Sequence, residues 1–158
     1  MALAGAPLTK QSTISPRNRS DRRPTLFLDA TNSSPELSNV LEASGWSVEH
    51  HRHHFKDQPD IADHEWIEII APKGWVIISC DKNMRSWRTE RGKVRPVIER
   101  TRAKVFFLSS GGRTMAEYGH AIGLVGKDIC RIVKQNARVH SFATIHTRGS
   151  RLGHMRVP

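Results

Sequence analysis

Short apolar runs rich in β-branched and aromatic residues recur along this chain, and each gap between them is long enough for a connecting segment. The runs cover residues 25–29, 46–50, 75–80 and 104–108, with a weaker one at 141–145. Continuous runs of this kind are typical of strands that are buried on both faces. Strands that alternate with helices form a parallel sheet through right-handed crossovers. The sequence therefore predicts an α/β fold with a central, mostly parallel sheet of about four or five strands.

Helical spacing of apolar residues occupies most of the intervening segments. The pattern predicts helices over 35–45, 63–72, 96–102 and 115–134, the first with Ser33 or Ser34 as its cap and Pro35 in its first turn. Residues 51–62 show little periodicity and predict a long loop. Its neighbouring histidines, His50, His51, His53 and His54, lack a matching pair elsewhere for a zinc site, so they are interpreted as solvated.

The length of 158 residues fits one domain of ordinary size. Residues 1–24 are polar, basic and aperiodic, which predicts a disordered basic tail. The folded domain is expected over 25–148, followed by a flexible basic C-terminal tail over 149–158. No apolar run approaches the roughly 18 residues of a membrane span, so no membrane association is expected. Two cysteines without disulfide or metal spacing favour the reducing cytoplasm.

Charge is distributed unevenly along the chain, whose formal net charge is +10. Residues 25–81 hold ten acidic and three basic side chains, whereas residues 82–104 hold nine basic and two acidic ones. The stretch 131–158 has six basic side chains and no acidic one. A basic surface beside a local acidic cluster is typical of proteins that bind a polyanion and perform metal chemistry on it.

Three aspartates are candidates for that chemistry. Asp29 and Asp81 each close an apolar strand, and ligands in open α/β sheets gather outside the carboxyl ends of the strands. Asp63 begins the helix that leads to the third strand. Crowded carboxylates require a neutralising cation, and Mg²⁺ prefers such oxygen ligands. The alternatives are that Asp63 is an N-cap and that Asp29 and Asp81 are ordinary turn residues.

The order of these segments resembles the PIN-like domains of VapC-type toxins from toxin-antitoxin systems. The resemblance covers about residues 25–108 and extends less closely to 145. It is carried by the following segments: Leu26-Phe-Leu-Asp29, Gly45-Trp-Ser-Val48, His54-Phe55, Asp63-His-Glu-Trp66-Ile67, Gly74-Trp-Val-Ile-Ile-Ser79-Cys-Asp81 and Lys82-Asn-Met-Arg85.

The resemblance implies a three-layer α/β/α nuclease that binds Mg²⁺ or Mn²⁺ and hydrolyses RNA. It assigns Asp29, Asp63 and Asp81 as catalytic metal ligands. Many PIN domains carry a fourth acid after the last of these, where this chain has Asn83, so Glu65 and Asn83 are accessory candidates. The expected partners are RNA, a cognate antitoxin protein and a second copy of the chain. A module that binds RNA or an antitoxin without catalysis and a nuclease acting on DNA are the alternatives.

The basic stretch directly after Asp81 is the predicted RNA-binding surface. Lys82, Arg85 and Arg88 would draw phosphates past the metal edge, with binding that weakens as salt is added. A solvated helix face is the alternative reading of these charges. Trp87 lies among them and would either stack an unpaired base or pack against the domain.

Overall fold

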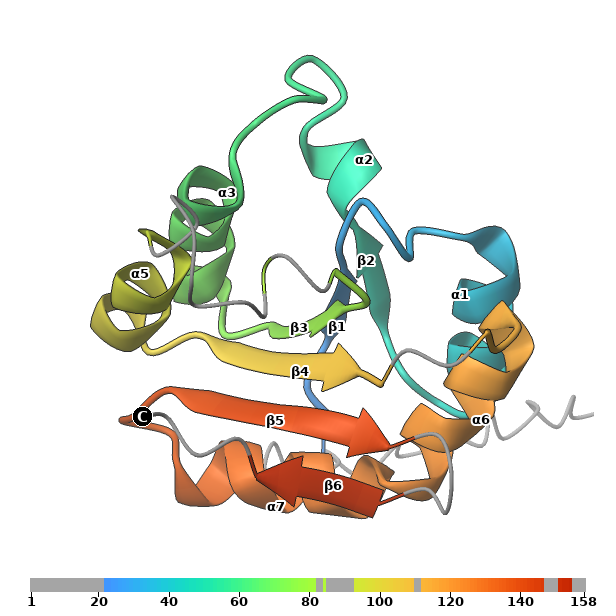
Figure 1. Ribbon diagram of the computed structural model, residues 1–158. Coiled ribbons are helices and arrows are strands. Elements are labelled where there is room, and N and C mark those ends of the chain that lie inside the picture. Colours follow the sequence, from blue (N-terminus) through green and yellow to red (C-terminus); the bar gives the residue numbers. More distant parts are fainter. Residues whose placement is uncertain (1–21, 82–83, 85–92, 110–111, 147–150, 155–158) are drawn as a thin grey trace, which may run out of the picture.

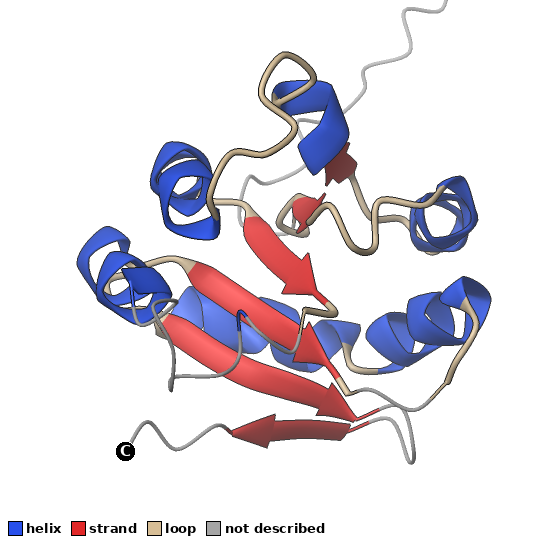
Figure 2. Ribbon diagram, turned by 45° about the horizontal axis from the view of Figure 1, so that its top comes forward, coloured by secondary structure: helices blue, strands red, loops and turns tan. Residues whose placement is uncertain are grey.

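The computed structural model describes residues 22–81, 84, 93–109, 112–146 and 151–154. These residues form one sheet with the strand order β2-β1-β3-β4-β5-β6. The strands are β1 (Leu26–Leu28), β2 (Val48–His50), β3 (Val76–Ser79), β4 (Lys104–Leu108), β5 (Ser141–His146) and β6 (Arg151–His154). Strands β1 to β5 are parallel, and β6 runs antiparallel along the edge of β5 (Figure 2). The predicted mostly parallel α/β fold is confirmed.

Helices cover both faces of this sheet, as the layers in Figure 1 show. The helical elements are α1 (Pro35–Ala43), α2 (His51–His54), α3 (Asp63–Ile70), the short 3-10 helix η2 (Ala71–Lys73), α5 (Val94–Thr101), α6 (Met115–Leu124) and α7 (Gly126–Gln135). Helices α1, α6 and α7 pack on one face, and α3 and α5 pack on the other. None of the described helices has the length and apolar character needed to cross a lipid bilayer.

The core has two halves because successive residues of a strand point to opposite faces. In β1, Leu26 and Leu28 face α1 and α6, whereas Phe27 faces α3 and α5. The same alternation places Ile78 in the first half and Ile77 in the second. All five side chains are completely buried. Burial on both faces explains why these strands are apolar without interruption in the sequence.

The structure differs from the predicted elements in three places. The helix predicted over 115–134 is two helices, which meet at Val125. Part of the loop predicted over 51–62 is the single turn α2, and Arg151–His154, within the predicted C-terminal tail, is strand β6. Strand β6 pairs only with β5, as an antiparallel edge strand. Its sequence, Arg-Leu-Gly-His, lacks the continuous apolar run of the buried strands, so the local pattern gives no strand signal there.

Helices α1 and α6 approach each other closely at a glycine. A Cβ atom added to Gly119 would lie 2.6 Å from Cγ1 and 2.8 Å from Cβ of Val40 on α1. Gly123, one turn later on the same helix, has only Ser44 Oγ at 3.9 Å. The two glycines therefore occupy different environments on one helix, and only Gly119 is required for the contact.

Substitution of these two glycines should have opposite effects on stability. Gly119→Ala should lower the free energy of unfolding by about 1–3 kcal/mol, because the added methyl group overpacks the contact with Val40. Gly123→Ala should leave stability unchanged or raise it by up to about 1 kcal/mol, because alanine is the better helix former. Urea unfolding of both variants measures the difference. Equal destabilisation by the two substitutions would contradict the close α1–α6 contact.

Candidate functional site

The strands β2, β1 and β3 are neighbours at one side of the sheet, and their register places their carboxyl ends level with one another. Leu28 of β1 lies opposite His50 of β2 on one side and Ile78 of β3 on the other. The next residues along these strands are therefore also neighbours. Asp29 follows β1 at this edge, with an exposed fraction of only 4%. The structure thus buries the first predicted site residue at the carboxyl edge of the sheet.

A tight turn after β1 holds the carboxylate of Asp29. Its Oδ1 atom accepts hydrogen bonds from the backbone N–H of Thr31 at 3.0 Å, the Thr31 hydroxyl at 2.7 Å and the backbone N–H of Asn32 at 3.2 Å. An aspartate that bonds to the backbone two residues on forms an Asx turn. This turn fixes the carboxylate before α1 begins, and the Ser34 hydroxyl caps that helix.

Ser79, the last residue of β3, connects the two strand-end aspartates. Its side chain is completely buried, and its hydroxyl oxygen accepts a hydrogen bond from the backbone N–H of Asp81 at 3.0 Å. The Ser79 hydroxyl is also hydrogen-bonded to the carboxylate of Asp29. Asp29 and Asp81 are therefore brought to the same edge through one shared serine. The sequence pattern predicts no role for Ser79, and its position two residues before Asp81 is the one local signal that points to it.

Burial raises the pKa of Asp29 from its ordinary value of 3.8 to about 6. Hydrogen bonds from Ser79, Thr31 and Asn32 act in the opposite direction, because they stabilise the ionised carboxylate. Desolvation is the larger effect. The ionised form of Asp29 is thus costly in the folded protein, and a bound cation would offset that cost.

Cys80 and Asn32 complete the surroundings of Asp29. Burial, with the negative charge of Asp29 as the second cause, raises the pKa of the Cys80 thiol to about 12. Cys80 is therefore a neutral thiol at physiological pH and not a nucleophile. The side-chain amide of Asn32 donates to the carbonyl of Ile78 at 3.1 Å. Its Oδ1 atom is buried and has no hydrogen-bond partner in the described part of the chain.

Asp63 occupies a different environment from Asp29. It is the first residue of α3, whose N-cap is Ala62, so the N-cap alternative for Asp63 is wrong. Its Oδ1 atom accepts a hydrogen bond from the indole N–H of Trp66 at 3.1 Å. Glu65, two residues on, accepts a hydrogen bond from the backbone N–H of Ala62 at 3.3 Å. Both carboxylates therefore stabilise the start of α3.

Two of the four neighbouring histidines are buried, which corrects the expectation that all are solvated. His50 and His51 are 8% and 4% exposed, and burial lowers the pKa of each. His50 Nε2 lies 2.7 Å from the Ser38 hydroxyl. The turn α2 packs the His51 ring against Phe27 and Trp66, with ring centroids 6.4 and 5.6 Å apart. These aromatic contacts stabilise histidines that the sequence pattern alone places in a polar loop.

The negative charge of Asp63 acts on the buried ring of His51. It opposes the lowering of the His51 pKa by burial, which requires the two side chains to lie within electrostatic range. Trp66 links the two side chains, because its indole donates to Asp63 and its ring lies 5.6 Å from that of His51, the first residue after β2. Asp29 and Asp81 instead follow β1 and β3. In the described residues, no group of three or more His, Cys, Asp or Glu side chains is arranged to hold a metal ion. The three predicted ligands are not gathered into one cluster there.

Comparison with known protein families gives a match over the first part of the domain. A family model described as a PIN like domain matches residues 24–110, more than half of the chain. The chain belongs to the PIN-like domain family. Searches among curated proteins and among solved structures gave no match. PIN-like domains are generally nucleases, which gives the carboxyl edge of this sheet its chemical context.

The donor atoms at the edge of this PIN-like domain suit a hard divalent cation. Mg²⁺ is commonly held by one or two carboxylates together with waters and substrate phosphate oxygens. Asp29 and Asp81 supply two carboxylates at one edge, and the unpartnered Oδ1 of Asn32 is a further buried oxygen next to Asp29. The raised pKa of Asp29 also favours a cation at this site, because a nearby positive charge stabilises the ionised form of a desolvated carboxylate. The residues present therefore fit such an ion.

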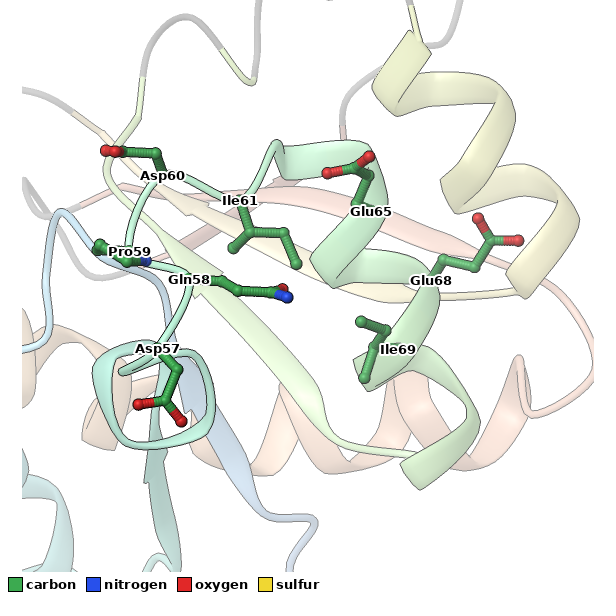
Figure 3. Close-up of a pocket in the computed structure, with 8 residues that line it drawn as sticks. All are labelled: Asp57, Gln58, Pro59, Asp60, Ile61, Glu65, Glu68 and Ile69. Carbon is green, nitrogen blue, oxygen red and sulfur yellow. The ribbon is translucent and has the colours of Figure 1, made fainter.

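A hollow of about 840 Å³ lies beside α3 (Figure 3). It is formed by the loop before α3 and by the outer side of that helix. Four carboxylates line it, together with Gln58, Pro59 and two isoleucines; the acidic residues are Asp57, Asp60, Glu65 and Glu68. Ile69 is 52% exposed there. Glu65 lines this acidic hollow, whereas Asp29 and Asp81 are not among its lining residues.

Several predicted site residues lie outside the described residues. These are the accessory candidate Asn83, the predicted RNA-binding residues Lys82, Arg85 and Arg88, and the stacking candidate Trp87. The predicted basic tail of residues 1–24 is described only from Arg22 onward. Their roles remain predictions.

The raised pKa of Asp29 predicts how stability depends on pH. Between about pH 4 and 6 the folded protein keeps the Asp29 proton that the unfolded chain loses, so the wild type loses stability as pH rises through this window. The neutral variant Asp29→Asn lacks this loss. At pH 8 without divalent metal it should exceed the wild type by on the order of 2–3 kcal/mol in free energy of unfolding.

Denaturant unfolding at pH 4 and at pH 8, in EDTA, measures this difference. The two proteins should be similar at pH 4 and should diverge at pH 8. Asp128→Asn is the matched control, because Asp128 is partly exposed and paired with Arg131 on α7. A constant difference between Asp29→Asn and the wild type at both pH values would contradict the raised pKa.

Proposed function

We propose that this PIN-like domain is a metal-dependent endoribonuclease that hydrolyses RNA phosphodiester bonds. The observation that carries the proposal is the buried Asp29 carboxylate, linked through Ser79 to Asp81 at the carboxyl edge of the sheet. A protein gains no stability from a desolvated carboxylate of raised pKa. Such a group is expected where function requires it.

Asp29 and Asp81 would hold Mg²⁺ or Mn²⁺ in this proposal. When bound, such an ion lowers the pKa of a water molecule and stabilises negative charge on the phosphate. The protein contributes the fixed position of the ligands: Thr31, Asn32 and Ser79 orient the Asp29 carboxylate by hydrogen bonds. Such supporting partners keep a ligand in its productive geometry.

Asp63 has a secondary role in the proposal, as a third carboxylate near the same edge that acts as a metal ligand or orients the attacking water. Its hydrogen bond with Trp66 restrains it beside His51, so its substitution should reduce cleavage less than that of Asp29. Glu65 is the weaker accessory candidate, because it caps Ala62 and lines the acidic hollow. Asn83 and the cations Lys82, Arg85 and Arg88 directly follow Asp81 in the sequence, which supports their proposed contact with the RNA strand.

We also propose that the nuclease is the toxin of a type II toxin-antitoxin pair in the cytoplasm, with a cognate antitoxin protein as its partner. The order of motifs from Asp29 to Arg85 supports this role, because it resembles VapC-type toxins. Induced expression in a bacterial host should therefore arrest growth. Asp29→Asn, produced at the same level, should allow growth to continue. Growth arrest by both proteins would contradict a toxic ribonuclease activity.

Cleavage of a labelled RNA pool tests the enzymatic proposal directly. The wild type should cut single-stranded or hairpin RNA with Mg²⁺ or Mn²⁺ and should be inactive in EDTA. Asp29→Asn and Asp81→Asn should reduce cleavage at least about a hundredfold, as expected when metal ligands or transition-state contacts are lost. RNA binding should be kept or strengthened, because a negative charge has been removed from the site.

Asp60→Asn is the matched control, since it removes one carboxylate from the acidic hollow and leaves the proposed site intact. Single-stranded DNA of the same sequence separates a ribonuclease from a deoxyribonuclease. A second readout is thermal unfolding: Mg²⁺ should raise the melting temperature of the wild type more than that of Asp29→Asn, because a ligand stabilises the state that binds it.

A non-catalytic module that binds RNA or an antitoxin is the second candidate function. One observation favours it: the described residues hold no group of three or more metal-binding side chains. The cleavage and thermal-unfolding experiments distinguish the binding module from the nuclease. RNA binding without cleavage under either metal, with no thermal shift caused by Mg²⁺, would support the binding module and contradict the nuclease.

A further inference from the structure

A second charged hollow lies on the side of the sheet that α7 covers. Its volume is about 490 Å³, and four cationic side chains line it: Arg23, Lys127, Arg131 and Lys134. The other lining residues are Gly126, Cys130 and Gln135. We call this hollow the α7 groove. No carboxylate is among its lining residues.

The spacing of the α7 residues explains why three of these cations share one face. Lys127, Arg131 and Lys134 are four and three residues apart, which places them in one stripe along the helix. The stripe extends over about 10 Å, given a rise of about 1.5 Å per residue. The opposite side of α7 buries Ile129 and Ile132 in the core. The cations are therefore presented to solvent by a helix that is fixed to the sheet.

Arg23 brings a fourth cation to the groove from another part of the chain. Its guanidinium lies over the Trp46 ring at 5.0 Å and donates a hydrogen bond to the carbonyl of Ser44 at 2.6 Å. Trp46 in turn packs against the start of α7: a Cβ on Gly126 would be 2.9 Å from its ring. The contact between Trp46 and Gly126 therefore holds Arg23 beside the stripe on α7.

The charges of the α7 groove are only partly neutralised. Arg131 forms an ion pair with Asp128 at 2.8 Å, with both side chains more than half exposed. Among the described residues, Lys127 and Lys134 have no ion pair. Arg23 and Lys134 both act electrostatically on the Cys130 thiol, opposing the rise of its pKa by burial. Like charges held this closely disfavour the folded state and attract an anion.

The α7 groove lies at the opposite edge of the sheet from Asp29. Arg23 comes before β1, whereas Asp29 follows the carboxyl end of the same strand. Lys104, at the start of β4, donates a hydrogen bond to the carbonyl of Asn136 directly after α7, so α7 ends at the amino edge. The acidic hollow beside α3 lies on the other face of the sheet (Figure 3). A polyanion bound at Asp29 is thus repelled on the α3 side and attracted on the α7 side.

We propose that the α7 groove binds backbone phosphates of the RNA strand whose scissile bond lies at Asp29. This inference rests on the proposed ribonuclease function and adds a second contact, remote from the metal edge. The strand must then extend well beyond the scissile phosphate. Long substrates gain affinity from the groove, whereas short substrates bind at the Asp29 edge alone.

Binding of a fluorescent 30-nucleotide RNA in EDTA tests this contact without cleavage. Lys127→Gln/Lys134→Gln should weaken binding on the order of tenfold at 0.1 M salt. It should also reduce the slope of log affinity against log salt by about 1.4, since each phosphate contact to a single strand contributes about 0.7. The matched control is Lys56→Gln/Lys73→Gln, which removes the same charge from the α2 and α3 side. It should retain the wild-type slope.

Cleavage of a six-nucleotide RNA with Mg²⁺ separates this inference from the ribonuclease proposal. Lys127→Gln/Lys134→Gln should cut the short RNA as the wild type does and should lose kcat/KM only on the long RNA. Equal weakening of binding by both double variants, or no weakening by either, would overturn the groove as an RNA contact. If Lys127→Gln/Lys134→Gln lost binding of inorganic pyrophosphate but kept the wild-type RNA affinity, the groove would be a small-anion site and the RNA contact would be overturned. An unchanged melting temperature verifies that the variants fold.

Discussion

The pairing register of β1 and β3 is the constraint on which the candidate site depends. Because Leu28 lies opposite Ile78, Asp29 ends its strand beside Ser79, and the serine hydroxyl reaches the Asp29 carboxylate and the backbone of Asp81. A shift of one residue would turn Leu28 from one core half to the other and would separate these groups. The apolar residues that fix the register therefore also fix the geometry of the polar site.

Burial of Asp29 at this edge requires specific polar partners. A desolvated carboxylate lowers the stability of the folded protein unless hydrogen bonds or a cation compensate it. Thr31, Asn32 and Ser79 supply hydrogen bonds, yet the pKa remains raised to about 6, so compensation within the protein is incomplete. The unpartnered Oδ1 of Asn32 adds a second buried oxygen with unmet hydrogen-bonding capacity. A divalent cation would satisfy both groups, which is the physical basis of the proposed metal chemistry.

The sequence reveals the fold well because strands buried on both faces have a strong local signal. The runs around Phe27 and Ile77 predict strands, and parallel crossovers then bring Asp29 and Asp81 to one edge. Long-range contacts have no such signal. Nothing local shows that His51 packs on Phe27, that Trp66 donates a hydrogen bond to Asp63, or that Gly126 lies against the Trp46 ring. The position of Asp63 relative to Asp29 depends on such contacts, and so the predicted three-carboxylate cluster could not be derived from spacing.

The net charge of +10 does not show how charges are distributed over the surface that a polyanion would contact. Opposite charges are separated on the described surface. Four carboxylates line the hollow beside α3, and four cations line the α7 groove on the other face of the sheet. Field lines between such regions orient an approaching strand before contact, and salt screens that effect over about 10 Å at 0.1 M. Asp29 lies at the carboxyl edge of the sheet, and the α7 groove lies at the amino edge. Under the proposed function, a strand attracted to the α7 side and repelled from the α3 side would cross the Asp29 edge in one orientation. The same charge separation would then govern both the affinity and which phosphate reaches Asp29.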